Sequence, residues 1–256
     1  MITHQIIVGL RDIEQQHNCR VLFAGESGSR AWGFPSPDSD YDVRFFYVHP
    51  PEWYLRLDDP KDTLEWFAPG DLDYSGWELR KALRLFAKCN QAMNEQLASP
   101  IVYESNGDFA QRIRELIPVY FNPIRVVHRY ISIAKPFTVP LFQGEPVGIK
   151  SLFYILRPLL GSEWVVQFRT MPPTEFVRVL DGITPDTDLR QYIDALIVQK
   201  ETVAEKDKIA VPPPIVDWIR STCERLPKEI EQFPRHEQPG WEPLQQLMND
   251  IVFAGK

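Results

Sequence analysis

The sequence predicts an α+β (α/β-like) fold: a small mixed β-sheet with helices, followed by a helical C-terminal domain. Three observations support this prediction. The first hundred residues alternate short apolar runs of strand length with amphipathic helical segments. Beyond residue 108 the apolar pattern is almost entirely helical. With 256 residues, the chain can form one or two domains with a sizeable core. The composition changes over residues 104–108, so we expect domains at 1–105 and 106–256.

The N-terminal domain is expected to begin with a helix over residues 3–18, because Ile6, Leu10 and Ile13 recur at helical spacing. Pro50 and Pro51 stop the second expected strand. The other expected elements follow in order: strands over 21–24, 41–48, 62–68 and 71–74, helices over 77–89 and 94–97, and an edge strand over 99–103.

The C-terminal domain is expected to consist of helices separated by prolines. Pro158 and Pro227 fall inside expected helices, so each is predicted to kink or end its helix. The expected helices cover residues 109–117, 123–135, 149–160, 174–180, 185–206 and 213–231, with a final amphipathic segment over 243–253.

Composition and charge exclude several classes of protein. Hydrophobic residues make up 44% of the chain and charged residues 25%, as in ordinary globular proteins. The formal net charge is −7, so contact with nucleic acid requires a local basic surface. Cys19, Cys89 and Cys223 form no Cys-x-x-Cys pair, which disfavours a zinc site and fits a reducing cytoplasm. No signal peptide or membrane-spanning run is evident, so we expect a cytoplasmic protein without a membrane partner.

One stretch carries recognisable chemistry. The small residues of Gly25-Glu26-Ser27-Gly28-Ser29 follow an apolar run of strand length, and they allow backbone N–H groups to approach an anion closely. Asp40 and Asp42 then stand at the start of the next expected strand, where residues two apart point to the same face. Paired carboxylates beside a turn suited to phosphate predict a divalent metal that carries a nucleotide.

This pattern resembles the polymerase-β-like nucleotidyltransferase superfamily, in which a Gly-Ser turn after the first strand precedes Asp-x-Asp on the next strand. The longer sequences GESGSRAWGFPSPDSDYDVRF and LDYSGWELRKALRL resemble a narrower family, the RNA-repair-pathway polymerase-β-like nucleotidyltransferases. The detailed match covers about the first hundred residues. A weaker similarity is present in KSLFYILRPL, which begins at Lys150.

The resemblance implies a metal-dependent enzyme. Asp40 and Asp42 would bind Mg²⁺ or Mn²⁺ together with the triphosphate of an NTP, and two metals about 4 Å apart can serve the attacking and leaving oxygens. The superfamily places a third metal-binding and catalytic carboxylate on a neighbouring strand. We assign it to Asp73, and Asp71 and Glu65 remain open as substitutes.

The nucleotide is expected to contact both domains. Gly28 and Ser29 would bind the β- and γ-phosphates through backbone N–H groups and the serine hydroxyl. Each of the remaining expected contacts has a structural alternative, either as a surface charge or, for the tyrosine, as core packing. These contacts are Arg30, Lys81, Lys150, Tyr154 and Arg157.

The expected reaction transfers a nucleoside monophosphate from an NTP to a hydroxyl and releases pyrophosphate. The family resemblance points to an RNA end as the acceptor, in RNA repair. Three alternatives remain: nucleotidylation of a small molecule or protein, a non-catalytic module that binds nucleotide or RNA, and a toxin–antitoxin partner whose role needs a second protein. A nucleophile elbow is disfavoured because Ser29 stands where that motif has glycine. A P-loop is disfavoured because Gly-Lys-Ser and Gly-Lys-Thr are absent.

Overall fold

The computed structural model describes residues 2–68, 71–183, 185–200 and 208–254. The chain divides into two compact units, and the predicted boundary at residues 105 and 106 falls inside the first of them. The α+β class is confirmed. The first unit comprises Met1–Ala31, Asp40–Tyr120 and Glu237–Lys256, and the second comprises Trp32–Ser39 and Phe121–His236.

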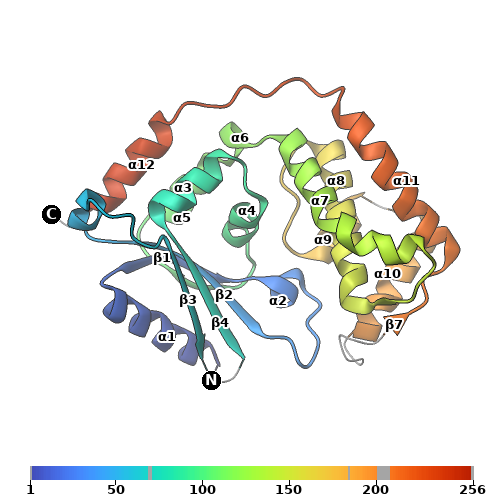
Figure 1. The fold of residues 1–256 in the computed structure, drawn as a ribbon, viewed down its shortest axis with the longest axis horizontal. Coiled ribbons are helices and arrows are strands. Elements are labelled where there is room, and N and C mark those ends of the chain that lie inside the picture. The colour runs from blue at the N-terminus through green and yellow to red at the C-terminus, as the bar shows by residue number, and fades with distance from the viewer. Residues whose placement is uncertain (1, 69–70, 184, 201–207, 255–256) are drawn as a thin grey trace. The chain divides into compact units, whose positions relative to one another are not determined.

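The first unit is built on a five-stranded mixed sheet with strand order β3-β4-β2-β1-β5 (Figure 1). β2 and β4 are parallel, and the other neighbouring pairs are antiparallel. Each predicted strand has an observed counterpart. β4 extends beyond the predicted residues 71–74, and β5 begins at Val102, three residues after its predicted start. The strands are β1 (Arg20–Glu26), β2 (Tyr41–Val48), β3 (Thr63–Ala68), β4 (Leu72–Glu78) and β5 (Val102–Ser105).

Helices cover both faces of this sheet. Alternate residues of a strand point to opposite faces, so Phe45 and Tyr47 belong to the apolar cluster under α1, whereas Phe46 belongs to the cluster on the other face. Burial of such aromatic side chains supplies much of the stability of a core. The helices of this unit are α1 (Ile2–His17), α2 (Gly28–Trp32), η1 (Pro51–Leu55), α3 (Leu79–Ala87), α4 (Gln91–Leu97), α5 (Phe109–Glu115), α6 (Ile117–Tyr120) and α12 (Glu242–Phe253). The last residue of α2, Trp32, is assigned to the second unit.

The start of α3 is fixed by a buried acid. Glu78 accepts hydrogen bonds from the backbone N–H groups of Arg80 at 2.8 Å and Lys81 at 3.3 Å, and from the Tyr54 hydroxyl at 2.5 Å. This capping satisfies donors that have no partner within the helix. The helix therefore begins at Leu79, two residues after its predicted start, because Trp77 and Glu78 complete β4.

The second unit is mainly helical, as predicted. α8 contacts α7, α9 and α11, and β6 pairs with β7. The predicted helix over 185–206 is observed as α10, and its last six predicted residues lie outside the described residues. The elements are α7 (Pro123–Phe142), β6 (Val147–Gly148), α8 (Ile149–Phe168), α9 (Phe176–Ile183), α10 (Thr187–Lys200), β7 (Lys208–Ile209) and α11 (Pro213–Ile230).

Pro158 does not end its helix. α8 continues to Phe168, beyond the predicted end at residue 160. The Ser162 hydroxyl donates to the carbonyl of Pro158 at 2.9 Å, and both residues are buried. Tertiary burial therefore outweighs the hydrogen bond that proline removes from the helix. Among the helices of the described residues, none has both the length and the apolar character required to cross a bilayer.

Gly76 provides a test of the packing at the centre of the sheet. A Cβ added there would lie 2.2 Å from the ring of Phe45. The Gly76→Ala substitution is expected to lower the free energy of unfolding by about 1–3 kcal/mol, because an overpacked core must shift. Urea denaturation would measure the change. Ser75→Ala on the same strand is the control and should change stability by less than about 0.5 kcal/mol. Equal stability of the two variants would contradict the close contact.

Candidate functional site

The candidate site lies at the edge of the sheet where β1 ends and β2 and β4 begin. Asp42 and Asp73 are direct Cα partners in the parallel register of β2 and β4. Their side chains are 29% and 26% exposed, so both carboxylates can meet solvent or a ligand. Two facing carboxylates repel each other unless a cation lies between them.

Arg44 supplies that cation. Its Nη2 donates to Asp42 Oδ1 at 2.7 Å and to Asp73 Oδ2 at 2.8 Å, and its Nη1 donates to the Asp73 carbonyl at 3.0 Å. The guanidinium thus holds both carboxylates in one hydrogen-bonded group. The sequence reasoning did not include Arg44. Its position two residues after Asp42, on the same face of the strand, was the available signal.

The glycine turn lies directly against Asp42. Gly28 begins α2 with φ +62°, and a Cβ there would lie 2.1 Å from Asp42 Oδ2. The Ser27 N–H also donates to the Asp42 carbonyl at 2.9 Å. Only glycine fits both the positive φ and the close approach. The structure therefore brings Gly28 to Asp42, with Ser29 half-buried as the next residue of α2.

A buried glutamate supports the backbone at Asp42. Glu26 ends β1, and its Oε1 accepts from the Asp42 N–H at 2.7 Å. The hydroxyl of Tyr103 also donates to Glu26. Burial raises the pKa of Glu26, and the hydrogen bonds from Tyr103 and Asp42 oppose part of that rise. The sequence reasoning assigned no role to Glu26, although an acid at the end of an apolar strand was a visible signal.

Asp40 stands one residue before β2, and its side chain is exposed. Arg30 orders this segment, because its Nε donates to the Asp40 carbonyl at 3.0 Å and its guanidinium lies 3.8 Å from the centroid of the Tyr41 ring. Within the part of the chain that the structure describes, no three acidic, histidine or cysteine side chains form a group that could hold a metal. Of the three predicted metal ligands, Asp42 and Asp73 meet at Arg44, and Asp40 lies two residues before Asp42 in the sequence.

Neither substitute for Asp73 joins the Arg44 group. Asp71 is exposed, has φ +58°, and its carbonyl accepts from the Tyr41 N–H at 2.8 Å. Glu65 is exposed on β3, opposite Ser75. Of the three candidates, Asp73 is the one that the structure brings to Asp42.

Lys81 lies at the other end of β4. Its Nζ contacts Asp62 Oδ1 at 2.8 Å and Thr63 Oγ1 at 2.6 Å. Along the strand, Asp73 is about 17 Å from Glu78, the residue before α3. The structure does not bring Lys81 to the carboxylates.

The three predicted nucleotide contacts on α8 belong to the second unit. Lys150 is exposed near the start of the helix. Tyr154 stacks on Phe137 with ring centroids 5.1 Å apart and meets the Trp32 ring edge-on at 6.1 Å. The Arg157 guanidinium lies 4.3 Å from the centroid of Trp32. Tyr154 and Arg157 therefore share one face of α8 and meet at the last residue of α2.

The donor set of the first unit fits a hard divalent cation. Asp42 and Asp73 offer carboxylate oxygens, which Mg²⁺ prefers, and both already bind a positive group at hydrogen-bond distance. The partial exposure of both side chains leaves room for water and phosphate ligands.

Facing aspartates on two parallel strands, with a glycine-serine turn against one of them, define the class of polymerase-β-like nucleotidyltransferases. The model of the RNA repair pathway DNA polymerase beta family matches residues 2–250, and the chain belongs to this family. The predicted family is confirmed, and the match extends well beyond the first hundred residues. Membership indicates an enzyme that transfers nucleotidyl groups.

Two known proteins resemble the chain along most of its length. One, from Bacillus subtilis (strain 168), is described as "Uncharacterized protein YcgL". It is 37% identical over 248 residues, which cover 97% of this chain and 95% of that protein. The other is the crystal structure of a nucleotidyltransferase-like protein from Exiguobacterium sibiricum 255-15. That match covers 94% of this chain and 78% of the other, with 9% identity and a TM-score of 0.37.

The Arg44 ion pairs predict a cation-dependent stability. Arg44→Gln leaves two facing carboxylates without their shared charge, so in chelator it should cost about 1 kcal/mol and lower the thermal midpoint by about 2–4 °C. Adding Mg²⁺ should raise the midpoint of this variant more than that of the wild type, because the ion binds the folded state.

The double variant Arg44→Gln/Asp73→Asn is the matched control. It removes one of the repelling charges and should recover part of the lost stability without Mg²⁺. A Mg²⁺ effect of equal size in all three proteins would show that Arg44 does not compensate the carboxylates.

Proposed function

We propose that the protein transfers a nucleoside monophosphate from an NTP to a hydroxyl acceptor at an RNA end and releases pyrophosphate. The observation that carries the proposal is the facing of Asp42 and Asp73 beside Gly28. The description of the family as an RNA repair pathway family supports the choice of acceptor.

In this proposal, Asp40, Asp42 and Asp73 hold Mg²⁺ or Mn²⁺. When bound, the metal neutralises charge on the attacking and leaving oxygens. Gly28 and Ser29 bind the β- and γ-phosphates through the backbone of the turn, which the positive φ of Gly28 keeps close to Asp42.

The reaction forms one bond and breaks another at the α-phosphorus. Asp73 orients the acceptor hydroxyl and takes its proton. The hydroxyl oxygen bonds to phosphorus, the bond to the bridging oxygen breaks, and that electron pair leaves with pyrophosphate. Before substrate arrives, both carboxylates are held by ion pairs with Arg44.

Three arginines and one lysine are proposed to bind phosphate. Arg44 would exchange the carboxylates for phosphate oxygens, since a guanidinium pairs with both. Arg30, Lys150 and Arg157 add positive charge, and Tyr154 offers a ring for the base. Lys81 is left out of this proposal, because Asp62 and Thr63 hold its ammonium group.

A non-catalytic nucleotide-binding module is the second candidate. The Arg44 ion pairs favour it, because a guanidinium already fills the space between the carboxylates. This candidate predicts that NTP binds without release of pyrophosphate, and that Asp42→Asn leaves NTP binding intact.

Substitution of the carboxylates distinguishes the two candidates. Asp42→Asn and Asp73→Asn should each reduce pyrophosphate release by at least about 100-fold, because lost charge stabilisation at the reacting oxygens costs that much in comparable sites. Asp71→Asn is the matched control on the same segment and should keep nearly full activity. Circular dichroism would establish that all three variants fold. If Asp71→Asn were the inactive variant, the choice of Asp73 would be wrong.

The acceptor is identified with α-labelled NTPs. Each NTP is incubated with Mg²⁺ or Mn²⁺ and with an RNA pool, a protein extract or a set of small hydroxyl compounds. If the wild type labels RNA and Asp42→Asn does not, the result supports an RNA end as the acceptor. Label only on protein or on a small compound would keep the transferase and reject the RNA acceptor.

A further inference from the structure

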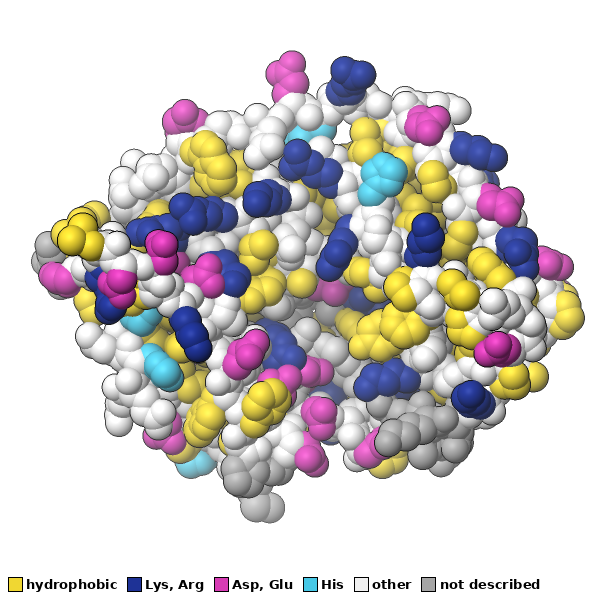
Figure 2. Space-filling view, viewed as in Figure 1, with side chains coloured by type: hydrophobic (Ala, Val, Ile, Leu, Met, Phe, Trp, Pro, Cys, Tyr) yellow, Lys and Arg dark blue, Asp and Glu magenta, His cyan; other side chains and the backbone are white. Residues whose placement is uncertain are grey.

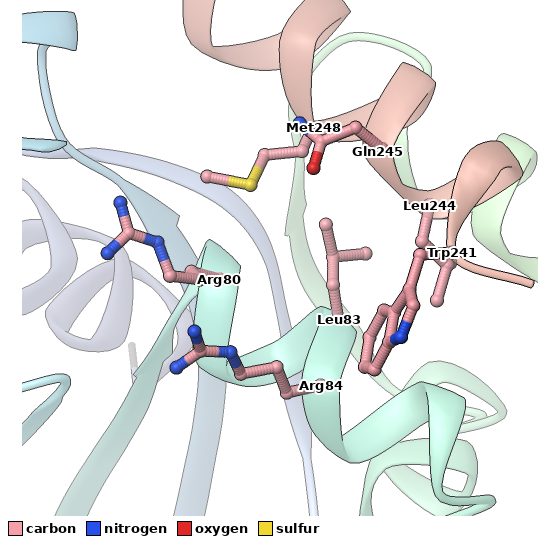
Figure 3. Close-up of a pocket in the computed structure, with 7 residues that line it drawn as sticks. All are labelled: Arg80, Leu83, Arg84, Trp241, Leu244, Gln245 and Met248. Carbon is pink, nitrogen blue, oxygen red and sulfur yellow. The ribbon is translucent and has the colours of Figure 1, made fainter.

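Away from the aspartate pair, a pocket lies on the first unit between α3 and α12 (Figure 3). Its volume is about 410 Å³. α3 contributes Arg80, Leu83 and Arg84, and the opposite wall includes Trp241 and Met248. The pocket is separate from the aspartate pair, because α3 begins where β4 ends and Asp73 stands near the start of β4.

The pocket presents positive charge from two arginines of α3. Among the described residues, neither Arg80 nor Arg84 has an ion-pair partner, whereas Lys81 on the same helix pairs with Asp62. Of the described residues that line the pocket, none is acidic. Figure 2 shows dark blue basic side chains gathered over α3. In a chain of net charge −7, such a surface is complementary to an anionic ligand.

The pocket also presents an exposed aromatic ring. Trp241 is 52% exposed although it is a large apolar residue. Its backbone is held in place, since its carbonyl accepts from the Gln245 N–H at 2.8 Å and the Tyr120 hydroxyl donates to the neighbouring Gly240 carbonyl at 2.6 Å. An exposed indole on a fixed backbone is suited to stacking on a flat ligand.

We propose that this pocket binds a single-stranded polynucleotide. Trp241 stacks on an unpaired base, with Leu83 and Met248 as its apolar surroundings. Arg80 and Arg84, four residues apart on one side of α3, pair with phosphates of the same strand. The amide of Gln245, which also lines the pocket, can donate to and accept from a base edge. A duplex fits less well, because its bases are stacked on each other and offer the indole no free face.

The pocket extends the proposed function by giving the acceptor strand a binding site away from the reacting end. The role of the pocket as an acceptor site rests on the proposed nucleotidyl transfer. The binding of a single strand to the pocket does not depend on that transfer. The experiment therefore measures binding alone, without NTP and in chelator, so that the aspartate site takes no part.

Fluorescence anisotropy with labelled RNA and DNA oligonucleotides tests the pocket. Trp241→Ala should weaken binding by about 5- to 150-fold, because it removes a stacked base. Arg84→Gln should weaken binding and also reduce the slope of log K against log salt by about 0.7, since one phosphate contact is lost. Trp241→Ala should leave that slope unchanged.

Lys88→Gln is the matched control, because it removes one positive charge from the end of α3 without touching the pocket. Its affinity should stay within about twofold of the wild type.

The outcomes separate the two proposals. If the wild type, Trp241→Ala and Arg84→Gln bound the oligonucleotide equally well, the proposal that this pocket binds a single strand would be wrong. The proposed nucleotidyl transfer would not be affected. If the protein transferred no nucleotide but still bound the oligonucleotide through the pocket, only the proposed reaction would be wrong. If AMP displaced the oligonucleotide at equal concentration, or if duplex bound as tightly as single strand, the pocket would not be a single-strand site. Tighter binding of RNA than of DNA would identify RNA as the source of the strand.

Discussion

The parallel pairing of β2 with β4 is the constraint on which the candidate site depends. Leu72 and Tyr74 are buried in the cluster under α1, so Asp73 between them must point to the opposite face. A shift of one residue would bury Asp73 and expose both apolar neighbours. The same hydrophobic pattern that fixes the register therefore also fixes Asp73 opposite Asp42.

Arg44 resolves the conflict that this register creates. Two facing carboxylates on adjacent strands repel each other unless a positive group lies between them. The bridging guanidinium donates to both acids and offsets the repulsion between them. Gly28 completes the arrangement, since its missing side chain lets the turn approach Asp42. The site is thus assembled before any nucleotide arrives, which lowers the cost of ordering it on binding.

The sequence predicted the parts of the fold that local patterns determine. Gly28 and Asp42 stand out in one short motif, and Asp73 follows from its position on a short predicted strand. Arg44 was missed because its role depends on the β2–β4 pairing, which brings together residues about thirty positions apart. The end of α8 was missed because burial outweighs the effect of Pro158. The last helix, α12, was predicted, but its return to α3 is a long-range contact that no local pattern encodes.

The separation of charges within the first unit bears on how an acidic protein can hold a polyanion. The charges of Asp42 and Asp73 together exceed that of Arg44, so the pair repels phosphates until a metal ion binds and gives a nucleic acid no initial affinity. Arg80 and Arg84 lie beyond the other end of β4 and have no acidic partners among the described residues. In the proposed function, the two arginines attract the polynucleotide and the two aspartates act on its end, and β4 holds these two groups at a fixed distance. The polynucleotide proposed to bind at the arginines then leaves the charges of Asp42 and Asp73 unneutralised, and its reacting end meets those two carboxylates.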